Sequence, residues 1–354
     1  MSEPINVADF ERLAEERCEP GYWGYVVGGA GDEVTLRDNV AAFRRRLLRP
    51  RMLVDVSNVS TRTTVLGTEV AMPLMVAPTS LQRVAHAEGE PAVARASAAV
   101  GTVYCLSSLA SVRPGELAAA VPDSLRWFQL YWSRDRGFTR ELVREAAENG
   151  FRALVLTVDL PAAGPRERDL RSGFGLPEGL PMPNLPRPLV GAHSFHDTLG
   201  EIVDTSLTWR DLEWLRAECA VPLVVKGVLT GEDAALACEH GADGIIVSNH
   251  GGRQLDGVPA TLDALPEVAE VVAGRAEVYL DGGIRRGTDV AKALALGARA
   301  VLVGRPALWG LAAGGETGAR RVLELLRDEI RLALVLLGCA TPDDVDPGHV
   351  RVRE

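Results

Sequence analysis

Eight short, continuously apolar runs alternate with helix-like stretches along the chain, and this rhythm restricts the possible folds to very few. Apolar strands alternating with helices are typical of parallel strands whose faces are covered by helices. The helix-like stretches include residues 88–100, 140–149, 232–240 and 288–296. The strand-like runs are 74–77, 103–106, 127–131, 153–158, 222–226, 244–248, 277–280 and 300–303.

Eight such units favour a closed α/β barrel, the (β/α)8 or TIM fold, over an open sheet. We therefore expect residues 1–354 to form one barrel domain. Residues 1–72 precede the first strand and are predicted to form an N-terminal helical cap. The fourth and fifth strands are separated by roughly sixty residues, where a βα unit needs roughly thirty. Loops of that length usually bind or cover a site, so residues 160–220 are predicted to form an active-site lid.

Composition excludes several classes of protein. The formal net charge of −10 provides no basic face for nucleic acid. No apolar run reaches the roughly 18 residues of a membrane helix, and the N-terminus does not resemble a signal peptide. The five scattered cysteines contain no CxxC pair, so neither disulfides nor a zinc site is expected. This cysteine usage predicts a cytoplasmic location. His193 and His196 form only a weak pair, so no metal site is expected.

The active site of such a barrel forms at the carboxyl ends of its strands. Polar or glycine-rich groups follow every predicted strand, and we expect them to share one face. Any single strand end means little, because loops are polar by default. The groups are Ala77-Pro78-Thr79-Ser80, Ser107-Ser108, Gln129 with Tyr131, Thr157 with Asp159, Lys226, Ser248–Arg253, Asp281–Arg285 and Gly304-Arg305.

The last two strand ends combine glycines with guanidinium groups. Gly282, Gly283 and Gly304 leave backbone N–H groups accessible, and Arg285 and Arg305 add positive charge. Barrels of this type often bind phosphate after strands 7 and 8, beside a helix N-terminus. We therefore predict a phosphate site there. The alternative is that the glycines only form a tight turn.

Lysine is rare in this chain, which contains 38 basic residues but only two lysines, Lys226 and Lys292. Lys226 follows a buried strand, where a lysine is costly unless it is paired. A compact charge facing a developing anion would explain its presence, and a Schiff-base lysine is the competing interpretation. Lys292 lies within a helical stretch and is expected to be solvated.

His250 is the candidate general base. A lone histidine is more often structural, but this one stands at a strand end between Ser-Asn and two glycines. Asp159, from a neighbouring strand end, could orient the ring and stabilise its protonated form. Arg253 and Arg166 could together bind a substrate carboxylate. For Arg166 the alternative is a solvated basic cluster with its arginine neighbours.

Several segments resemble the FMN-dependent 2-hydroxy-acid oxidase and dehydrogenase family, which includes glycolate oxidase, lactate oxidase and mandelate dehydrogenase. The most specific match is SNHGGRQLDG at 248–257. The likeness spans residues 25 to about 306 and is greatest to actinobacterial hydroxymandelate oxidases. The supporting segments are APTSLQRVAHAEGE (77–90), WFQLYW (127–132), LTVD (156–159), VVKG (224–227) and residues 281–306.

The resemblance implies FMN as cofactor and a role for each candidate residue. His250 removes the α-proton, or the hydroxyl proton with concerted hydride transfer, and Asp159 supports it. Arg253 and Arg166 bind the carboxylate, Tyr25 and Tyr131 line the substrate site, and Tyr131 also assists catalysis. Lys226 faces the flavin N1/O2 edge. The other implied flavin and phosphate contacts are Ala77, Pro78, Thr79, Ser107, Gln129, Thr157, Ser248, Asp281, Gly282, Gly283, Ile284, Arg285, Gly304 and Arg305.

Two departures from the family pattern bear on the substrate. Leu109 stands where plant glycolate oxidases carry tryptophan, which favours an aryl or medium-chain substrate. Pro165 replaces the first of two arginines often found in that loop, while Arg166 still aligns with the functional one.

The expected reaction oxidises an (S)-2-hydroxy acid to the 2-keto acid, with O2 reoxidising the flavin and giving H2O2. Alternatives are a dehydrogenase with another electron acceptor and a monooxygenase that decarboxylates its product. A different FMN barrel or a non-catalytic binding protein is less consistent with the residues. The resemblance also implies a homo-oligomer, a tetramer or an octamer.

Overall fold

Eight parallel strands close into a barrel in the computed structural model, which describes residues 3–177, 179–186 and 203–353. The barrel closes where β11 pairs in parallel with β4, with Val301 opposite Leu74. All eight predicted strands and the predicted barrel are confirmed. The strands are β4 Leu74–Val76, β5 Val103–Leu106, β6 Leu125–Tyr131, β7 Leu154–Thr157, β8 Leu223–Val228, β9 Gly244–Val247, β10 Glu277–Asp281 and β11 Ala300–Val303.

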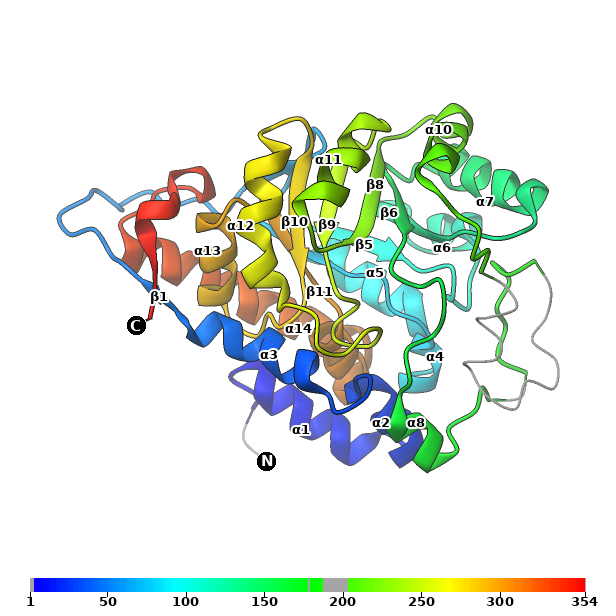
Figure 1. Cartoon of the computed structure of the whole chain (residues 1–354). Helices are drawn as coiled ribbons and strands as arrows, with labels where there is room; N and C mark the ends of the chain where they lie inside the picture. The colour runs from blue at the N-terminus through cyan, green and yellow to red at the C-terminus, as the bar shows by residue number, and fades with distance from the viewer. Residues whose placement is uncertain (1–2, 178, 187–202, 354) are drawn as a thin grey trace.

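Helices between the strands cover the outside of the barrel (Figure 1). In α7 the buried residues Thr139, Leu142, Val143 and Ala146 recur at spacings of three and four, which gives the helix one face for the barrel. The covering helices are α4 Gln82–Ala85, α5 Gly89–Ala99, α6 Pro114–Ala120, α7 Arg136–Glu148, α10 Trp209–Glu218, α11 Gly231–Glu239, α12 Thr261–Val272, α13 Gly287–Ala295 and α14 Arg305–Leu337.

The barrel interior follows from the two-residue period of a strand. Alternate residues point inward, and Cys105, Trp127, Val155 and Tyr279 are among those that fill the interior. Cys105 is fully buried there, as expected for a core residue. The next inward positions lie at the carboxyl ends of the strands, where they meet a cavity instead of the core. Several of them are polar: Ser107, Gln129, Thr157, Lys226 and Asp281.

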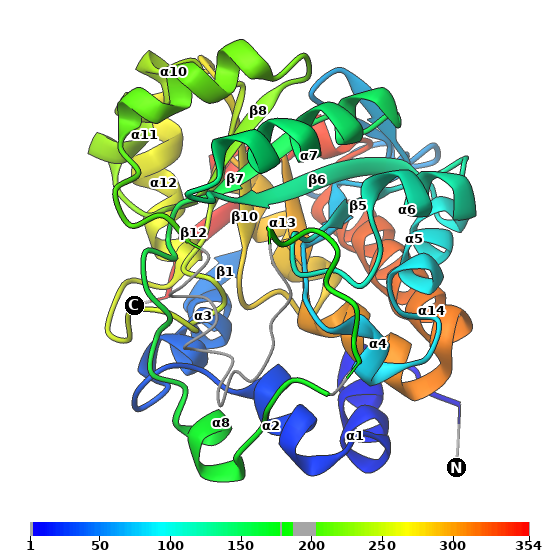
Figure 2. The ribbon, with the colours of Figure 1, turned by 90° about the vertical axis from the view of Figure 1, so that its right-hand side faces the viewer.

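Three N-terminal helices lie across the end of the barrel where the strands finish (Figures 1 and 2). They are α1 Val7–Arg17, α2 Pro20–Val27 and α3 Val34–Arg44. Helix α1 packs against α14, α3 packs against α12, and α2 packs against α8 Glu167–Ser172. The packing of these helices therefore places residues from before the first barrel strand beside the candidate site.

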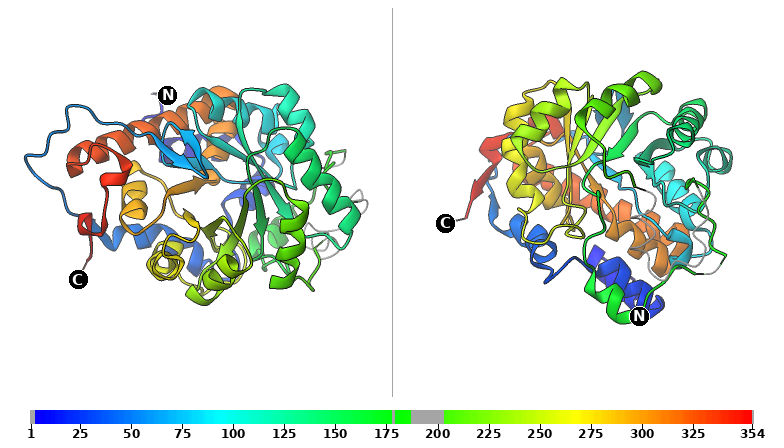
Figure 3. Two further views of the ribbon diagram at one scale, coloured as in Figure 1. Left: turned by 90° about the horizontal axis from the view of Figure 1, so that it is seen from above. Right: turned by 45° about the vertical axis from the view of Figure 1, so that its right-hand side comes forward.

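The remainder of the N-terminal segment is not helical. Strand β1 Arg46–Leu48 pairs with the C-terminal strand β12 Val350–Val352. Strands β2 Thr63–Val65 and β3 Thr68–Val70 form a hairpin whose Val65 and Val70 pack against the barrel interior. The Leu66 N–H donates to Glu277, the first residue of β10, so the hairpin covers the end opposite the cap (Figure 3).

The long segment after β7 contains helices at both ends. Helix α8 lies beside the cap helix α2, and α10 packs against α7 of the outer ring (Figure 2). His193 and His196 lie outside the described residues. The lid proposed for residues 160–220 stays a prediction. No helix of the described residues is long and apolar enough to span a membrane.

Lys292 was expected to be solvated, but its side chain is partly buried. Its ammonium group donates to the carbonyl of Phe43 at 2.8 Å, and burial lowers its pKa. The end of α3 covers this part of α13, so the side chain joins two helices. A helical pattern in the sequence of α13 gives no information about a helix that arrives from elsewhere in the chain.

Candidate active site

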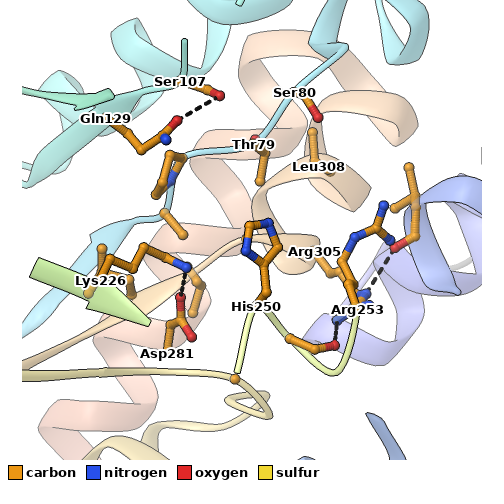
Figure 4. Close-up of a pocket in the computed structure, with 18 of the residues that line it drawn as sticks. Thr79, Ser80, Ser107, Gln129, Lys226, His250, Arg253, Asp281, Arg305 and Leu308 are labelled. Carbon is orange, nitrogen blue, oxygen red and sulfur yellow. Dashed lines mark hydrogen bonds and ion pairs between the residues drawn. The ribbon is translucent and has the colours of Figure 1, made fainter. Parts of the chain in front are cut away.

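A cavity with about 1030 Å³ of empty space, part of it open to solvent, lies at the carboxyl ends of the strands. All eight strand ends contribute to its lining, and α2 adds Tyr25 and Val26 (Figure 4). Every predicted site residue lines the cavity except Asp159 and Ser248, which instead bond to lining residues.

His250 projects into this cavity from a strained turn after β9 (Figure 4). Its φ of 56° is left-handed, and Gly251 and Gly252 continue the left-handed backbone. Such a conformation is costly for a residue other than glycine and persists only where its surroundings hold it. Here the His250 N–H donates to the Ser248 hydroxyl at 3.1 Å, and the Gly252 N–H donates to the Asn249 side chain at 3.0 Å.

The His250 ring is oriented by a carboxylate from the neighbouring loop. Its Nδ1 lies 2.8 Å from Oδ1 of Asp159, which leaves Nε2 as the nitrogen for a substrate. Burial lowers the pKa of His250, the Lys226 charge acts in the same direction, and Asp159 opposes both. Burial acts to raise the pKa of Asp159, but the positive charges of His250 and Lys226 outweigh it and lower that pKa. A neutral imidazole beside an ionised carboxylate can accept a proton.

Lys226 forms a second buried pair, with Asp281, near His250 (Figure 4). Its ammonium lies 3.1 Å from Oδ2 of Asp281 and donates to Ser248 at 2.9 Å. Burial acts to lower the pKa of Lys226, but Asp281 and Asp159 outweigh it and raise the pKa. A charged ammonium is a poor nucleophile, so this environment disfavours the Schiff-base alternative.

Three partly buried guanidinium groups lie in the cavity without a salt bridge to a carboxylate of the described residues: those of Arg253, Arg285 and Arg305. Arg253 donates to the carbonyls of Tyr25 and Gly28, and Arg285 stacks on Trp309 at 4.7 Å. Burial lowers the pKa of all three arginines, for Arg253 to about 10. Buried charge without a counter-ion is costly, so this arrangement favours binding of anions.

Arg166 also lies in the cavity, at the start of α8. Its side chain is only 3% exposed, whereas those of Arg168 and Arg171 are 51% and 76% exposed. The alternative of a solvated basic cluster therefore does not apply to Arg166. The guanidiniums of Arg166 and Arg253 lie 5.7 and 4.7 Å from the ring centre of Tyr25, so two positive charges and a phenol meet at one place.

The donors and acceptors around the cavity fit FMN. Oδ1 of Asp281 is buried and has no hydrogen-bond partner among the described residues, which suits a ribityl hydroxyl. The Gln129 amide bonds to Thr157 at 3.0 Å and to Ser107 at 3.1 Å, giving a buried polar row for the ring edge. The unpaired guanidiniums suit a phosphate.

Comparison with known proteins agrees with this chemistry. The family model described as FMN-dependent dehydrogenase matches residues 14–352. The chain belongs to the FMN-dependent dehydrogenase family. The predicted resemblance, the FMN cofactor and the class of enzyme, an FMN-dependent oxidoreductase acting on CH–OH groups, are thereby confirmed.

Relatives of known activity match nearly the whole chain. An L-lactate oxidase of Nostoc sp. is 50% identical over 362 residues and covers 99% of both chains. The human 2-hydroxyacid oxidase 1 is 48% identical, covering 98% of this chain and 96% of the relative. A crystal structure of mandelate oxidase with (S)-4-hydroxymandelic acid superposes with a TM-score of 0.93 at 43% identity, covering 98% of each chain.

Sequence reasoning missed some residues of the cavity. Leu160 follows Asp159 into the lining, so its place in the chain beside a predicted residue was the available signal. Ser80 was expected only as part of a strand end; it lines the cavity and shares a 2.6 Å hydrogen bond with the Tyr25 hydroxyl. The other missed residues, which carry no chemical signal in the sequence, are Val26, Leu302, Val303, Pro306 and Leu308.

Replacing Arg285 tests the anion site. Arg285→Ala should weaken FMN binding by about 1.5–3 kcal/mol, the contribution of a hydrogen bond to a charged group. Titration of the apoprotein with FMN measures this change. Arg286→Ala is the matched control, because Arg286 is half exposed and pairs with Glu329. Equal FMN affinity in the two variants would mean that Arg285 does not bind the phosphate.

Proposed function

We propose that this enzyme oxidises an (S)-2-hydroxy acid to the corresponding 2-keto acid, with His250 as the base. The observation that carries the proposal is that His250, held by Asp159 at 2.8 Å, shares one cavity with Arg253 and Arg166. FMN, when bound, supplies the acceptor for the two electrons that leave the substrate. We propose O2 as the final electron acceptor, giving H2O2.

The substrate carboxylate is assigned to Arg253 and Arg166. Arg166 is buried and Arg253 is partly buried beside Tyr25, where an anion meets less competition from water than at the surface. Burial raises the pKa of Tyr131 well above its ordinary value, so its hydroxyl stays protonated and can donate a hydrogen bond to the substrate. These groups orient the hydroxy acid before any proton moves.

The proton from the substrate goes to Nε2 of His250. Asp159 then faces an imidazolium ion, whose positive charge it stabilises. This assignment holds whether the proton comes from the α-carbon or from the hydroxyl group. Lys226 keeps a second positive charge in the cavity, where it would stabilise negative charge on a bound flavin.

The residues assigned to FMN come from all parts of the strand-end face. Asp281, the glycines after β10 and β11, and the two arginines that follow them are assigned to the ribityl chain and phosphate. Ser248 is assigned a supporting role, since it bonds to Lys226. The ring and upper ribityl chain are assigned to Ala77, Pro78, Thr79, Ser107, Gln129, Thr157 and Lys226, and the rest to Asp281, Gly282, Gly283, Ile284, Arg285, Gly304 and Arg305.

An aryl or medium-chain substrate is proposed because Leu109 lines the cavity. Mandelate oxidase structures with (S)-mandelic acid and (S)-4-hydroxymandelic acid support an aryl group, whereas the lactate and glycolate oxidases among the relatives act on smaller acids. A dehydrogenase with another acceptor and a decarboxylating monooxygenase are the alternatives. Anaerobic flavin reduction across 2-hydroxy acids, followed by admission of air and assay of H2O2 and keto acid, separates them.

Removing the base tests the mechanism most directly. His250→Ala should retain FMN but reduce the rate of flavin reduction by roughly three or more orders of magnitude, the effect of losing a general base and its linked electrostatics. Stopped-flow absorbance at the flavin band measures the rate, and the bound flavin is quantified separately. Near-parental turnover in a loaded variant would remove His250 from the mechanism.

The pH profile tests the role of Asp159. The parent's kcat/KM should fall as His250 becomes protonated, below its ordinary pKa of about 6.5 because burial lowers this pKa. Asp159 raises the pKa of His250, so Asp159→Asn should shift this acidic limb to still lower pH. The rate should also fall by about two orders of magnitude or more. A limb that moves to higher pH contradicts Asp159 as the counter-charge.

The size of the substrate site depends on Leu109. The parent should prefer (S)-mandelate to glycolate by at least about tenfold in kcat/KM, because each buried CH2 contributes about 0.8 kcal/mol. Leu109→Trp should narrow this preference by filling the space for the ring. Leu255→Trp serves as the control, since Leu255 is 72% exposed. Comparable efficiency of the parent on the two acids rules out this interpretation.

A further inference from the structure

We infer that Gln254 is a positioning residue that holds Asp159 and Arg166 in register with His250 and Arg253. This inference rests on the proposed function, which gives those four residues their roles. Gln254 itself does not line the cavity and touches no reacting group. It lies next to Arg253 in the loop after β9, with only 9% of its surface exposed.

The amide of Gln254 is fully used, and all its bonds go to the loop after β7. Its Nε2 donates to the carbonyl of Asp159 at 2.8 Å and to the carbonyl of Ala162 at 2.8 Å. Its Oε1 accepts from the N–H of Gly164 at 3.2 Å. One side chain from the loop of the base thus binds three backbone groups in the loop of its counter-charge.

The two loops are also packed as closely as backbones allow. A Cβ on Gly164 would lie 2.4 Å from the carbonyl oxygen of Arg253 and 2.5 Å from that of Gln254. From the opposite side, a Cβ on Gly227 would lie 2.7 Å from Cβ of Asp159, and Gly227 has a φ of +116°. The start of the β7 loop is therefore enclosed between β8 and the Gln254 loop.

This segment needs an external support because it has no regular structure of its own. No helix or strand lies between the end of β7 at Thr157 and the start of α8 at Glu167. The few backbone bonds there include those from Val158 to Lys226 and from Gly31 to Pro165. Catalytic groups must be held to about 0.5 Å, and a displacement of about 1 Å can cost a hundredfold in rate.

A pair of substitutions separates this role from simple packing. Gln254→Met keeps the length of the side chain but removes all three hydrogen bonds. Gln254→Glu keeps the shape, but its ionised form would direct a carboxylate at the carbonyl oxygens of Asp159 and Ala162. Burial and these neighbours raise the pKa of such a carboxyl, and its protonated form regains one donor. The charged groups that act on the neighbouring His250 and Arg253 are Asp159, Asp169, Arg166 and Lys226.

The test measures the rate of flavin reduction in the FMN-loaded enzyme from about pH 5.5 to about pH 9, in steps of about one pH unit. The substrate is (S)-mandelate or L-lactate, whichever reduces the parent faster. Both Gln254 variants should lose about tenfold or more at high pH. The ratio of Gln254→Glu to parent should rise as the pH falls, whereas the ratio for Gln254→Met should stay flat. Thermal unfolding and flavin content report folding, and Leu255→Ala is the exposed neighbouring control.

The outcomes are distinct. Parental rates in both Gln254 variants, or equal losses with no dependence of the Gln254→Glu ratio on pH, overturn the inference. His250→Ala is measured in the same series. If that variant keeps the parental rate, the proposed function fails, whatever the Gln254 variants do. If Gln254→Glu does not fold, Gln254→Asn replaces it. The shorter amide should reduce the rate of flavin reduction, and the ratio of its rate to that of the parent should not rise at low pH.

Discussion

The hydrogen bonds from Arg253 and Arg305 to the carboxyl end of α2 are the contact on which the rest of the site depends. Arg305 donates to the carbonyls of Val26, Gly28 and Gly251, and Arg253 shares the Gly28 carbonyl. The last carbonyls of a helix lack partners within it and carry partial negative charge, so they suit cations. These bonds satisfy the helix end and fix the cap on the barrel, but they leave the guanidiniums with positive charge for an anion.

The same contact connects the turn that carries His250 with the cap helix that carries Tyr25. Through Gly251 it reaches the left-handed turn that carries His250, and through α2 it positions the ring of Tyr25. Opposite charges elsewhere in the cavity are paired, as in Lys226 with Asp281 and His250 with Asp159. The guanidiniums without a salt bridge therefore favour anions in their part of the cavity, while the two ion pairs set the protonation states of their members.

Much of the barrel and the site was predictable because both follow from local patterns. Continuous apolar runs predicted the strands, and polar residues at their ends predicted the lining. The rest depends on contacts between distant segments. Tyr25 bonds to Ser80, 55 residues away in the sequence, and Lys292 bonds to a carbonyl of α3. The residues adjacent to Tyr25 and Lys292 in the sequence do not predict either contact. The left-handed backbone of His250 could not be predicted either, since a lone histidine gives no local reason for it.

The groups that accept hydrogen bonds at the end of α2 are main-chain oxygens, and this has a consequence for divergence. A carbonyl is present whatever side chain is attached, so substitutions along α2 leave the attachment of the helix to the arginines chemically unchanged. The helix is then free to vary the side chains that it presents to the cavity. An enzyme built in this way can acquire new substrates through changes in its N-terminal segment while the hydrogen bonds that hold this segment stay the same.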